Sequence, residues 1–245
     1  MNKKVLISLL FIILVLLGIL SVSQSENVRG VLGSIGKVTI VVDPGHGGID
    51  GGAESRSGVC EKDINLHIAM KIKEQAEAEG WRVMMTRETD MGLYSEGKGS
   101  IRGKKTEDLR NRQDLINHSG ADASVSIHLN SYPSQEVKGA QTFYSKDSPE
   151  GKIIAEIIQT RINEALDPEN DRSPLPKDDI IIMKNNKAPL VLVECGFLSN
   201  DAEAEKLQNE EYQEKLAAVI TMGLKEFFIS TGKVKKEEIP VILSN

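Results

Sequence analysis

Apolar residues recur along the chain in two patterns that predict different elements. Short runs, either continuously apolar or alternating with polar residues, predict strands. These strands lie at residues 38–42, 81–87, 124–128, 139–144, 180–182 and 190–193. Apolar stripes with a helical repeat predict longer helices, with a further short helix after Asn200. The longer helices lie at about 64–79, 106–117, 149–166 and 210–229.

The order of these elements predicts the fold class. Strands that alternate with helices indicate a single α/β domain, in which a mostly parallel sheet carries helices on both faces. The first strand is an unbroken β-branched run, which is typical of a strand buried on both faces. We expect the strand at 139–144 to lie at an edge of this sheet.

Capping and turn residues predict where the helices begin and the loops lie. Asp63 is a candidate N-cap for the first long helix, and Gly80 a candidate for its end. Thr106 is the candidate N-cap of the next helix. Residues 88–105 and 167–178 are polar and interrupted by glycine or proline, so both are predicted to be loops.

The N-terminus differs from the rest of the chain. Two lysines precede an almost unbroken apolar run of 18 residues, from Val5 to Val22, and a polar stretch follows. This pattern favours a secretory signal or signal-anchor over a buried core helix. We therefore expect a signal peptide or signal-anchor at 1–25, a tether at 26–36 and a mixed-charge tail at 231–245. The working part would be exported, either secreted or attached to the membrane by the N-terminal segment.

Charge and cysteine content exclude some classes of protein. Without residues 1–25, the chain keeps 28 basic and 36 acidic residues, a formal charge of −8. No basic stripe appears, so nucleic acid is not an expected partner. Cys60 and Cys195 are the only cysteines, which excludes a disulfide framework but leaves one bridge between them open.

A histidine follows the first predicted strand on a tight loop, in the sequence Asp43-Pro44-Gly45-His46. Proline and several glycines break the strand here. Ligands of open α/β sheets bind beyond the carboxyl ends of the strands, where His46 would lie. The alternative is a hairpin or crossover turn with a bystander histidine. The glycine spacing matches neither a phosphate-binding loop nor a dinucleotide fingerprint.

Three more polar residues are predicted to join His46. His128 and Glu194 each end an apolar strand, and Glu61 lies in the loop that returns to the first helix. A charged residue after four apolar ones is costly unless it is paired, bound to metal or catalytic. Two histidines and one carboxylate are a common catalytic zinc set with an open position for water. Glu194 would then be the general base, although spacing alone does not prove that these residues converge.

Other candidates have structural interpretations. His67 is expected to pack half-buried on the first long helix, and His118 to interact with a helix C-terminus. Neither cysteine is a predicted zinc ligand, since structural thiolate ligands come in sets. Asn130 and Arg87 are candidate substrate-binding residues, with an ordinary loop role as the alternative.

The sequence also resembles a known family, the zinc-dependent N-acetylmuramoyl-L-alanine amidases of the Amidase_3 type, over residues 37–230. The resemblance rests on motifs spread along the chain: Val41–Ala53 with Glu61-Lys62-Asp63, Met85-Thr86-Arg87, Leu109 with Arg112 and Asn117, Ser126–Asn130, and Val193–Asn200. It implies a six-stranded mixed sheet flanked by helices. It also implies that His46, Glu61 and His128 hold one zinc ion and that Glu194 is the catalytic glutamate.

Within that family, residues 102–112 and 194–200 are most similar to the germination-specific, spore-cortex branch. This resemblance implies hydrolysis of the amide between N-acetylmuramic acid and L-alanine in peptidoglycan, during formation of muramic-δ-lactam in the forespore and cortex space. An accessory protein is a candidate partner. Two alternatives stay open: another zinc hydrolase of the cell wall, a peptidase or deacetylase, and a non-catalytic wall-binding protein on the same fold.

Overall fold

The computed structural model describes residues 38–97 and 99–235. Its strands are β1 (Thr39–Pro44), β2 (Arg82–Met85), β3 (Ala123–Asn130), β4 (Gln141–Ser145), β5 (Leu175–Lys177) and β6 (Leu190–Phe197). Its helices are α3 (Glu61–Ala78), α4 (Ile101–His118), α5 (Pro149–Leu166), α6 (Asp201–Gln208) and α7 (Glu210–Ser230), with a single 3₁₀ turn, η1 (Ile181–Met183).

The strands form one six-stranded sheet in the order β2-β1-β3-β6-β4-β5. The pairs β1–β2, β1–β3, β3–β6 and β4–β5 are parallel, and only β4–β6 is antiparallel. The predicted single α/β domain with a mostly parallel, mixed sheet is confirmed. The carboxyl ends of β1, β3 and β6 therefore meet at one edge of the sheet.

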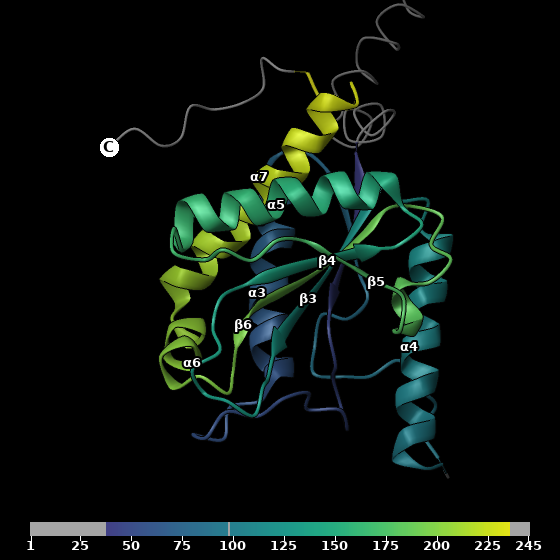
Figure 1. The fold of residues 1–245 in the computed structure, drawn as a ribbon. Helices are drawn as coiled ribbons and strands as arrows, with labels where there is room; N and C mark the ends of the chain where they lie inside the picture. Colours follow the sequence, from purple (N-terminus) through teal and green to yellow (C-terminus); the bar gives the residue numbers. More distant parts are fainter. Residues whose placement is uncertain (1–37, 98, 236–245) are drawn as a thin grey trace, which may run out of the picture. The chain divides into compact units, whose positions relative to one another are not determined.

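Helices cover both faces of the sheet, but unequally (Figure 1). On one face, α3, α5 and α7 pack on alternate residues of the central strands, including Val42, Val125 and Val193. On the other face, α4 and η1 cover a smaller cluster that includes Val41 and Leu192. Because side chains alternate along a strand, each central strand sends one set of residues to each cluster. The prediction of helices on both faces is confirmed.

Two helices begin earlier than predicted. Helix α3 starts at Glu61 after Cys60, so Asp63 lies in its first turn instead of capping it. Helix α4 starts at Ile101, five residues before Thr106, because Ser100 is the N-cap and its side chain accepts a hydrogen bond from the Gly103 amide. The Thr106 hydroxyl instead donates to the carbonyl of Arg102, one turn back in the same helix.

The region between β4 and β6 also differs from prediction. Residues 181–183 form the turn η1 instead of a strand, and Ile182 and Met183 are buried with Leu190 on the α4 face. The apolar run therefore covers one face of the sheet instead of forming a strand within it. Part of the predicted loop at 167–178 is the strand β5, and its pairing with β4 removes β4 from the sheet edge.

The terminal predictions fall largely outside the described residues. The signal or anchor at 1–25 and the tether at 26–36 both lie there. Within 38–97 and 99–235, no helix combines the length and the apolar character needed to cross a membrane. At the other end, Lys233 forms an ion pair with Asp122, so the start of the predicted tail contacts the domain.

Candidate metal centre

The four predicted site residues meet at the carboxyl edge of the sheet. His46 lies in the turn after β1, and Glu61 is the first residue of α3. His128 and Glu194 are register partners on β3 and β6, so their side chains lie next to each other on one face. Both lie inside their strands rather than at the ends, because β3 continues to Asn130 and β6 to Phe197.

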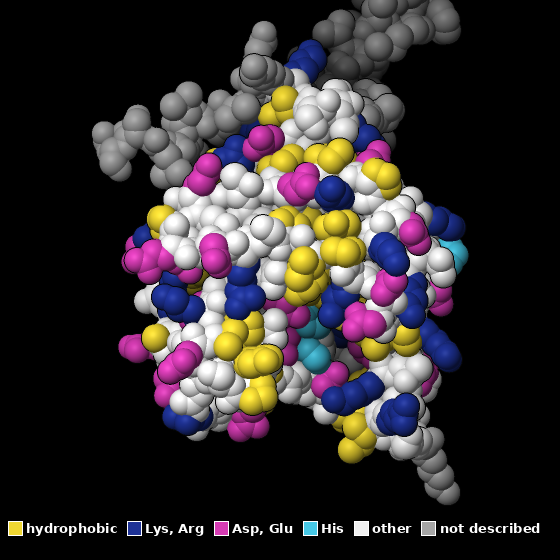
Figure 2. Space-filling model, viewed as in Figure 1, with side chains coloured by type: hydrophobic (Ala, Val, Ile, Leu, Met, Phe, Trp, Pro, Cys, Tyr) yellow, Lys and Arg dark blue, Asp and Glu magenta, His cyan; other side chains and the backbone are white. Residues whose placement is uncertain are grey.

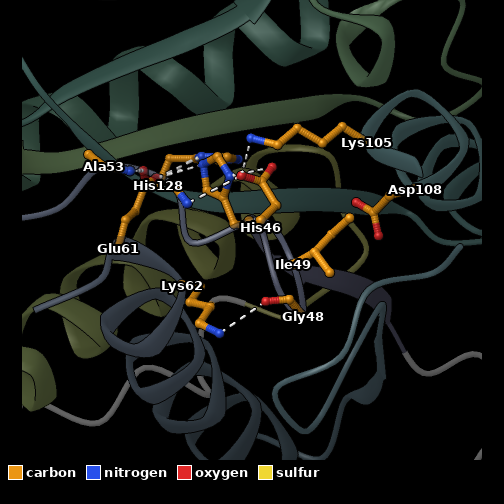
Figure 3. A network of polar contacts seen from close by, with 12 residues as sticks. His46, Gly48, Ile49, Ala53, Glu61, Lys62, Lys105, Asp108 and His128 are labelled. Atoms are coloured by element: carbon orange, nitrogen blue, oxygen red, sulfur yellow. Dashed lines mark hydrogen bonds and ion pairs between the residues drawn. The ribbon is translucent and has the colours of Figure 1, made fainter. Parts of the chain in front are cut away.

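Three of these side chains converge on one point. The ligand atoms of His46, Glu61 and His128 all lie within 4.8 Å of one another. Glu61 Oε1 is 3.1 Å from His46 Nε2 and 3.0 Å from His128 Nδ1. The two imidazole rings meet edge to face, with 4.9 Å between their centroids. Figure 3 shows both rings turned toward the Glu61 carboxylate.

The Glu61 carboxylate is held in place from several sides. Its Oε2 accepts a hydrogen bond from the amide of Ala53 at 2.8 Å. Its Oε1 accepts from the amide of Leu129 at 2.9 Å and from the side chain of Asn65 at 3.2 Å. Together with the two imidazoles, four donors therefore crowd on one oxygen. Two imidazole nitrogens and a buried, fixed carboxylate are a donor set that suits a divalent transition metal such as zinc.

Two glycines allow the backbone of the turn to approach these side chains. A Cβ at Gly45 would lie 2.3 Å from Cε1 and Nε2 of His128. At Gly52, where φ is +71°, a Cβ would lie 2.5 Å from Glu61 Oε2. Any larger residue at either position would overlap a candidate ligand. These two positions therefore require glycine for close approach to the candidate metal ligands.

The carboxylate of Asp50 orients the His46 ring. Asp50 Oδ2 lies 2.9 Å from His46 Nδ1, which leaves Nε2 directed at Glu61. Burial lowers the pKa of His46, but hydrogen bonds to Asp50 and Glu61 outweigh this effect and raise it to about 9. Burial raises the pKa of Glu61, but the hydrogen bonds from His128 and His46 lower it by more, so the net shift is downward. A histidine ligand must be a neutral imidazole, so a bound metal ion would displace the proton that these carboxylates favour on His46.

Glu194 has a different environment from Glu61. Its Oε2 is buried and has no hydrogen-bond partner among the described residues. Burial raises the pKa of Glu194, and the negative charge of Glu61 raises it further, while His128 acts in the opposite direction. A carboxylate beside the candidate metal ligands that is ready to accept a proton has the properties of a general base.

Two buried arginines fix the turn that carries His46. Arg87 donates to the carbonyls of Pro44 and Gly45, both at 3.0 Å. Arg112 donates to the carbonyl of Pro44 at 2.7 Å and to that of His46 at 2.5 Å. The guanidinium of Arg87 thus supports the loop, and its predicted contact with substrate stays a prediction.

Asp43 completes this support and is fully buried. It accepts hydrogen bonds from Thr86 at 2.6 Å, from Ser126 at 2.5 Å and from Arg112 at 2.8 Å. Burial raises the pKa of Asp43, but the charge of Arg112 and these hydrogen bonds outweigh burial and lower it. Sequence reasoning missed Asp43 as a support, although it follows an apolar run just as Glu194 does.

The remaining candidates lie outside the cluster. His67 is exposed on α3 rather than half-buried, because it falls one position off the buried stripe that contains Ile64 and Ile68. His118 lies in the last turn of α4, as expected, with Nδ1 2.7 Å from the carbonyl of Asp114. Cys60 and Cys195 are both free thiols.

Asn130 ends β3 next to the site, and its side-chain oxygen accepts from the amide of Ser131 at 2.8 Å. Its predicted role in binding substrate stays a prediction.

The site itself is open to solvent. Figure 2 shows histidine side chains at the bottom of a hollow at the centre of the displayed face, beside acidic side chains and between apolar patches.

Known proteins resemble this chain in both sequence and fold. A germination-specific N-acetylmuramoyl-L-alanine amidase of Bacillus subtilis is 41% identical over 197 residues, which cover 80% of this chain and 82% of the relative. The CwlD amidase from Clostridioides difficile, solved in complex with the GerS lipoprotein, has a TM-score of 0.78 and 43% identity, over 79% of this chain and 100% of that one. An N-acetylmuramoyl-L-alanine amidase from Clostridium difficile 630 has a TM-score of 0.69 and 31% identity, over 80% of this chain and 100% of that one. Residues 40–226 match the N-acetylmuramoyl-L-alanine amidase family itself, and the chain therefore belongs to this family.

Proposed function

We propose that this amidase holds one zinc ion on His46, Glu61 and His128 and uses Glu194 as its general base. The proposed reaction is hydrolysis of the amide between N-acetylmuramic acid and L-alanine in peptidoglycan. The observation that carries the proposal is the convergence of two imidazoles and a fixed carboxylate beside Glu194 Oε2, a buried oxygen with no partner among the described residues.

Zinc, when bound, would lower the pKa of a coordinated water and polarise the amide carbonyl. The residues of the chain supply the rest of the chemistry. Glu194 would take a proton from the attacking water and pass it to the amine of L-alanine as that group leaves. Burial raises the pKa of Glu194, which makes its carboxylate a stronger base, and this supports the first half of that transfer.

We further propose that the substrate is the spore cortex, where removal of the stem peptide would precede formation of muramic-δ-lactam. The similarity to a germination-specific amidase supports this proposal. The complex of a solved relative with a lipoprotein supports an accessory protein as partner. Export and attachment to the membrane by residues 1–25 would place the enzyme in the forespore and cortex space.

The test is incubation of the purified protein with cortex peptidoglycan, with and without zinc, followed by mass spectrometry. The expected product is a free stem peptide that begins with L-alanine. A chelator and Glu194→Ala should each abolish its release, and Glu194→Ala should still bind one zinc ion. Loss of zinc from Glu194→Ala would instead make Glu194 a ligand and contradict its role as base.

The same assay separates the alternatives. A peptidase would cut within the stem peptide, and a deacetylase would release acetate and leave the peptide attached. A wall-binding protein would retain peptidoglycan without any product. Zinc binding without product from pure protein, followed by release once an accessory lipoprotein is added, would identify a partner-dependent amidase.

A further inference from the structure

Helix α4 reaches His46 from two directions. Arg112 Nη2 donates to the backbone carbonyl of His46 at 2.5 Å. At the imidazole ring of His46, the contact runs through Asp50. Lys105 Nζ lies 2.7 Å from Asp50 Oδ1, and Asp50 Oδ2 lies 2.9 Å from His46 Nδ1. Figure 3 shows Lys105 extending from α4 toward the imidazole of His46. One helix thus contacts the backbone of this residue and, through a carboxylate, its ring.

The contacting residues of α4 share one face of the helix. Lys105, Asp108 and Arg112 are spaced three and four residues apart, so they line up along the helix. Asp108 Oδ2 accepts from Arg112 Nε at 2.6 Å, and Asp108 Oδ1 accepts from the amide of Leu93 at 2.5 Å. Arg112 is therefore fixed within α4, and Lys105 is the outermost contact of the series.

Asp50 depends on Lys105 for its orientation. Besides Lys105 and His46, the Asp50 carboxylate has one further hydrogen bond among the described residues, from the amide of Gly52 at 3.3 Å, which is long for a hydrogen bond. The Asp50 side chain is 21% exposed, so water would compete for it once Lys105 is removed. A carboxylate free to rotate would no longer hold the His46 ring with Nε2 directed at the metal position.

We propose that Lys105 is a positioning residue for the metal centre, acting through Asp50 on the ring of His46. The inference rests on the proposed zinc site and extends it to α4. Supports of this kind typically change metal affinity by roughly 10- to 100-fold when they are removed. Lys105→Met is therefore expected to weaken zinc binding by at least about 10-fold.

The direction of the change in zinc affinity distinguishes a positioning role of Lys105 from a purely electrostatic effect of its charge. Removing a positive charge near a cation site should by Coulomb's law strengthen zinc binding. Positioning through Asp50 predicts the opposite. Arg110→Met is the matched control, since it removes one exposed positive charge from the same helix. The Lys105 side chain is 46% exposed, and the Asp50 carboxylate is 21% exposed and keeps its contact with His46, so the replacement leaves no fully buried charge without a partner.

The experiment measures the zinc dissociation constant of each variant by competition with a chromophoric chelator. The melting temperature of each metal-free protein is measured beside it. Lys105→Met should bind zinc at least about 10-fold more weakly than Arg110→Met at an unchanged melting temperature. Lys105→Arg should recover part of the loss, because a guanidinium can also reach a carboxylate.

A double-mutant cycle tests the route through Asp50. Asp50→Asn alone should weaken zinc binding, and adding Lys105→Met to it should cause little further loss. Zinc affinity of Lys105→Met equal to or above that of Arg110→Met would overturn this inference alone. A wild-type protein that binds no zinc would overturn the proposed function, and this inference with it.

Discussion

Gly45→Ala places a single methyl group against a candidate metal ligand. The new Cβ would lie 2.3 Å from both Cε1 and Nε2 of His128, whereas ordinary contacts begin near 3.4 Å. The turn cannot easily yield, because Arg87 holds the carbonyls of Pro44 and Gly45 at 3.0 Å. The imidazole of His128 would therefore have to withdraw by about 1 Å.

A shift of that size is large for a metal site. Metal–ligand distances hold to within about 0.2 Å, so His128 could not keep its bond to the ion. We expect zinc affinity and kcat/KM each to fall by about 100-fold or more. The fold should persist at a cost of about 1–3 kcal/mol, the usual range for overpacking. Chelator competition, peptide release and thermal melting measure the three quantities.

Gly51→Ala is the control from the same loop. A Cβ at position 51 would meet only Cys60 Sγ at 3.6 Å, an ordinary contact. Zinc affinity and activity of this variant should stay close to wild type. Wild-type zinc affinity in Gly45→Ala, or an equal loss in Gly51→Ala, would refute the reasoning from close approach.

Further predictions concern Glu194, the proposed base, and the corrected start of α4. Burial raises the pKa of Glu194, so its contribution to stability is greatest below the unfolded pKa near 4.5 and is lost as pH rises through the folded pKa. Glu194→Gln has no charge to bury, so its metal-free form should melt at a higher temperature than wild type at about pH 7, and the difference should close toward about pH 4.5 in calorimetry. Ser100→Ala removes the N-cap of α4 and should cost about 1 kcal/mol of unfolding free energy in urea titrations, whereas Thr106→Ala should cost much less; an equal cost at both positions would contradict the cap assignment.

The sequence predicts which residues meet at the carboxyl edge of the sheet more accurately than it predicts the helix ends. Glu194 and His128 could be selected because a polar residue in an apolar strand needs a partner, and the parallel order of the strands brings them together. The start of α4 was missed because residues 101–105 carry only one apolar side chain, exposed Ile101, and therefore show no helical stripe. The hydrophobic pattern of a sequence indicates which residues are buried, and the first turn of α4 buries no apolar side chain.

Contacts between distant segments had no signal in the sequence. Lys105 contacts Asp50, and Arg112 contacts Asp43, only because α4 packs on the face of the sheet that carries Val41. Arg112 carried part of the family resemblance, but its bonds to the turn were not foreseen. The sequence predicts a strand at residues 180–182, where the structure has a 3₁₀ turn, because a short apolar run looks the same whether it enters a sheet or covers one.

The alternation of β6 has a consequence for chemical labelling and oxidation. Glu194 and Cys195 are adjacent in this strand, so their side chains leave it on opposite sides. The thiol enters the apolar cluster beneath α3, α5 and α7, where burial raises its pKa well above normal. Peroxide and alkylating reagents attack the thiolate, so Cys195 is shielded from them although it directly follows the candidate base. Cys60, only partly buried before α3, is the thiol that a fluorescent maleimide would reach, and it offers a reporter beside Glu61.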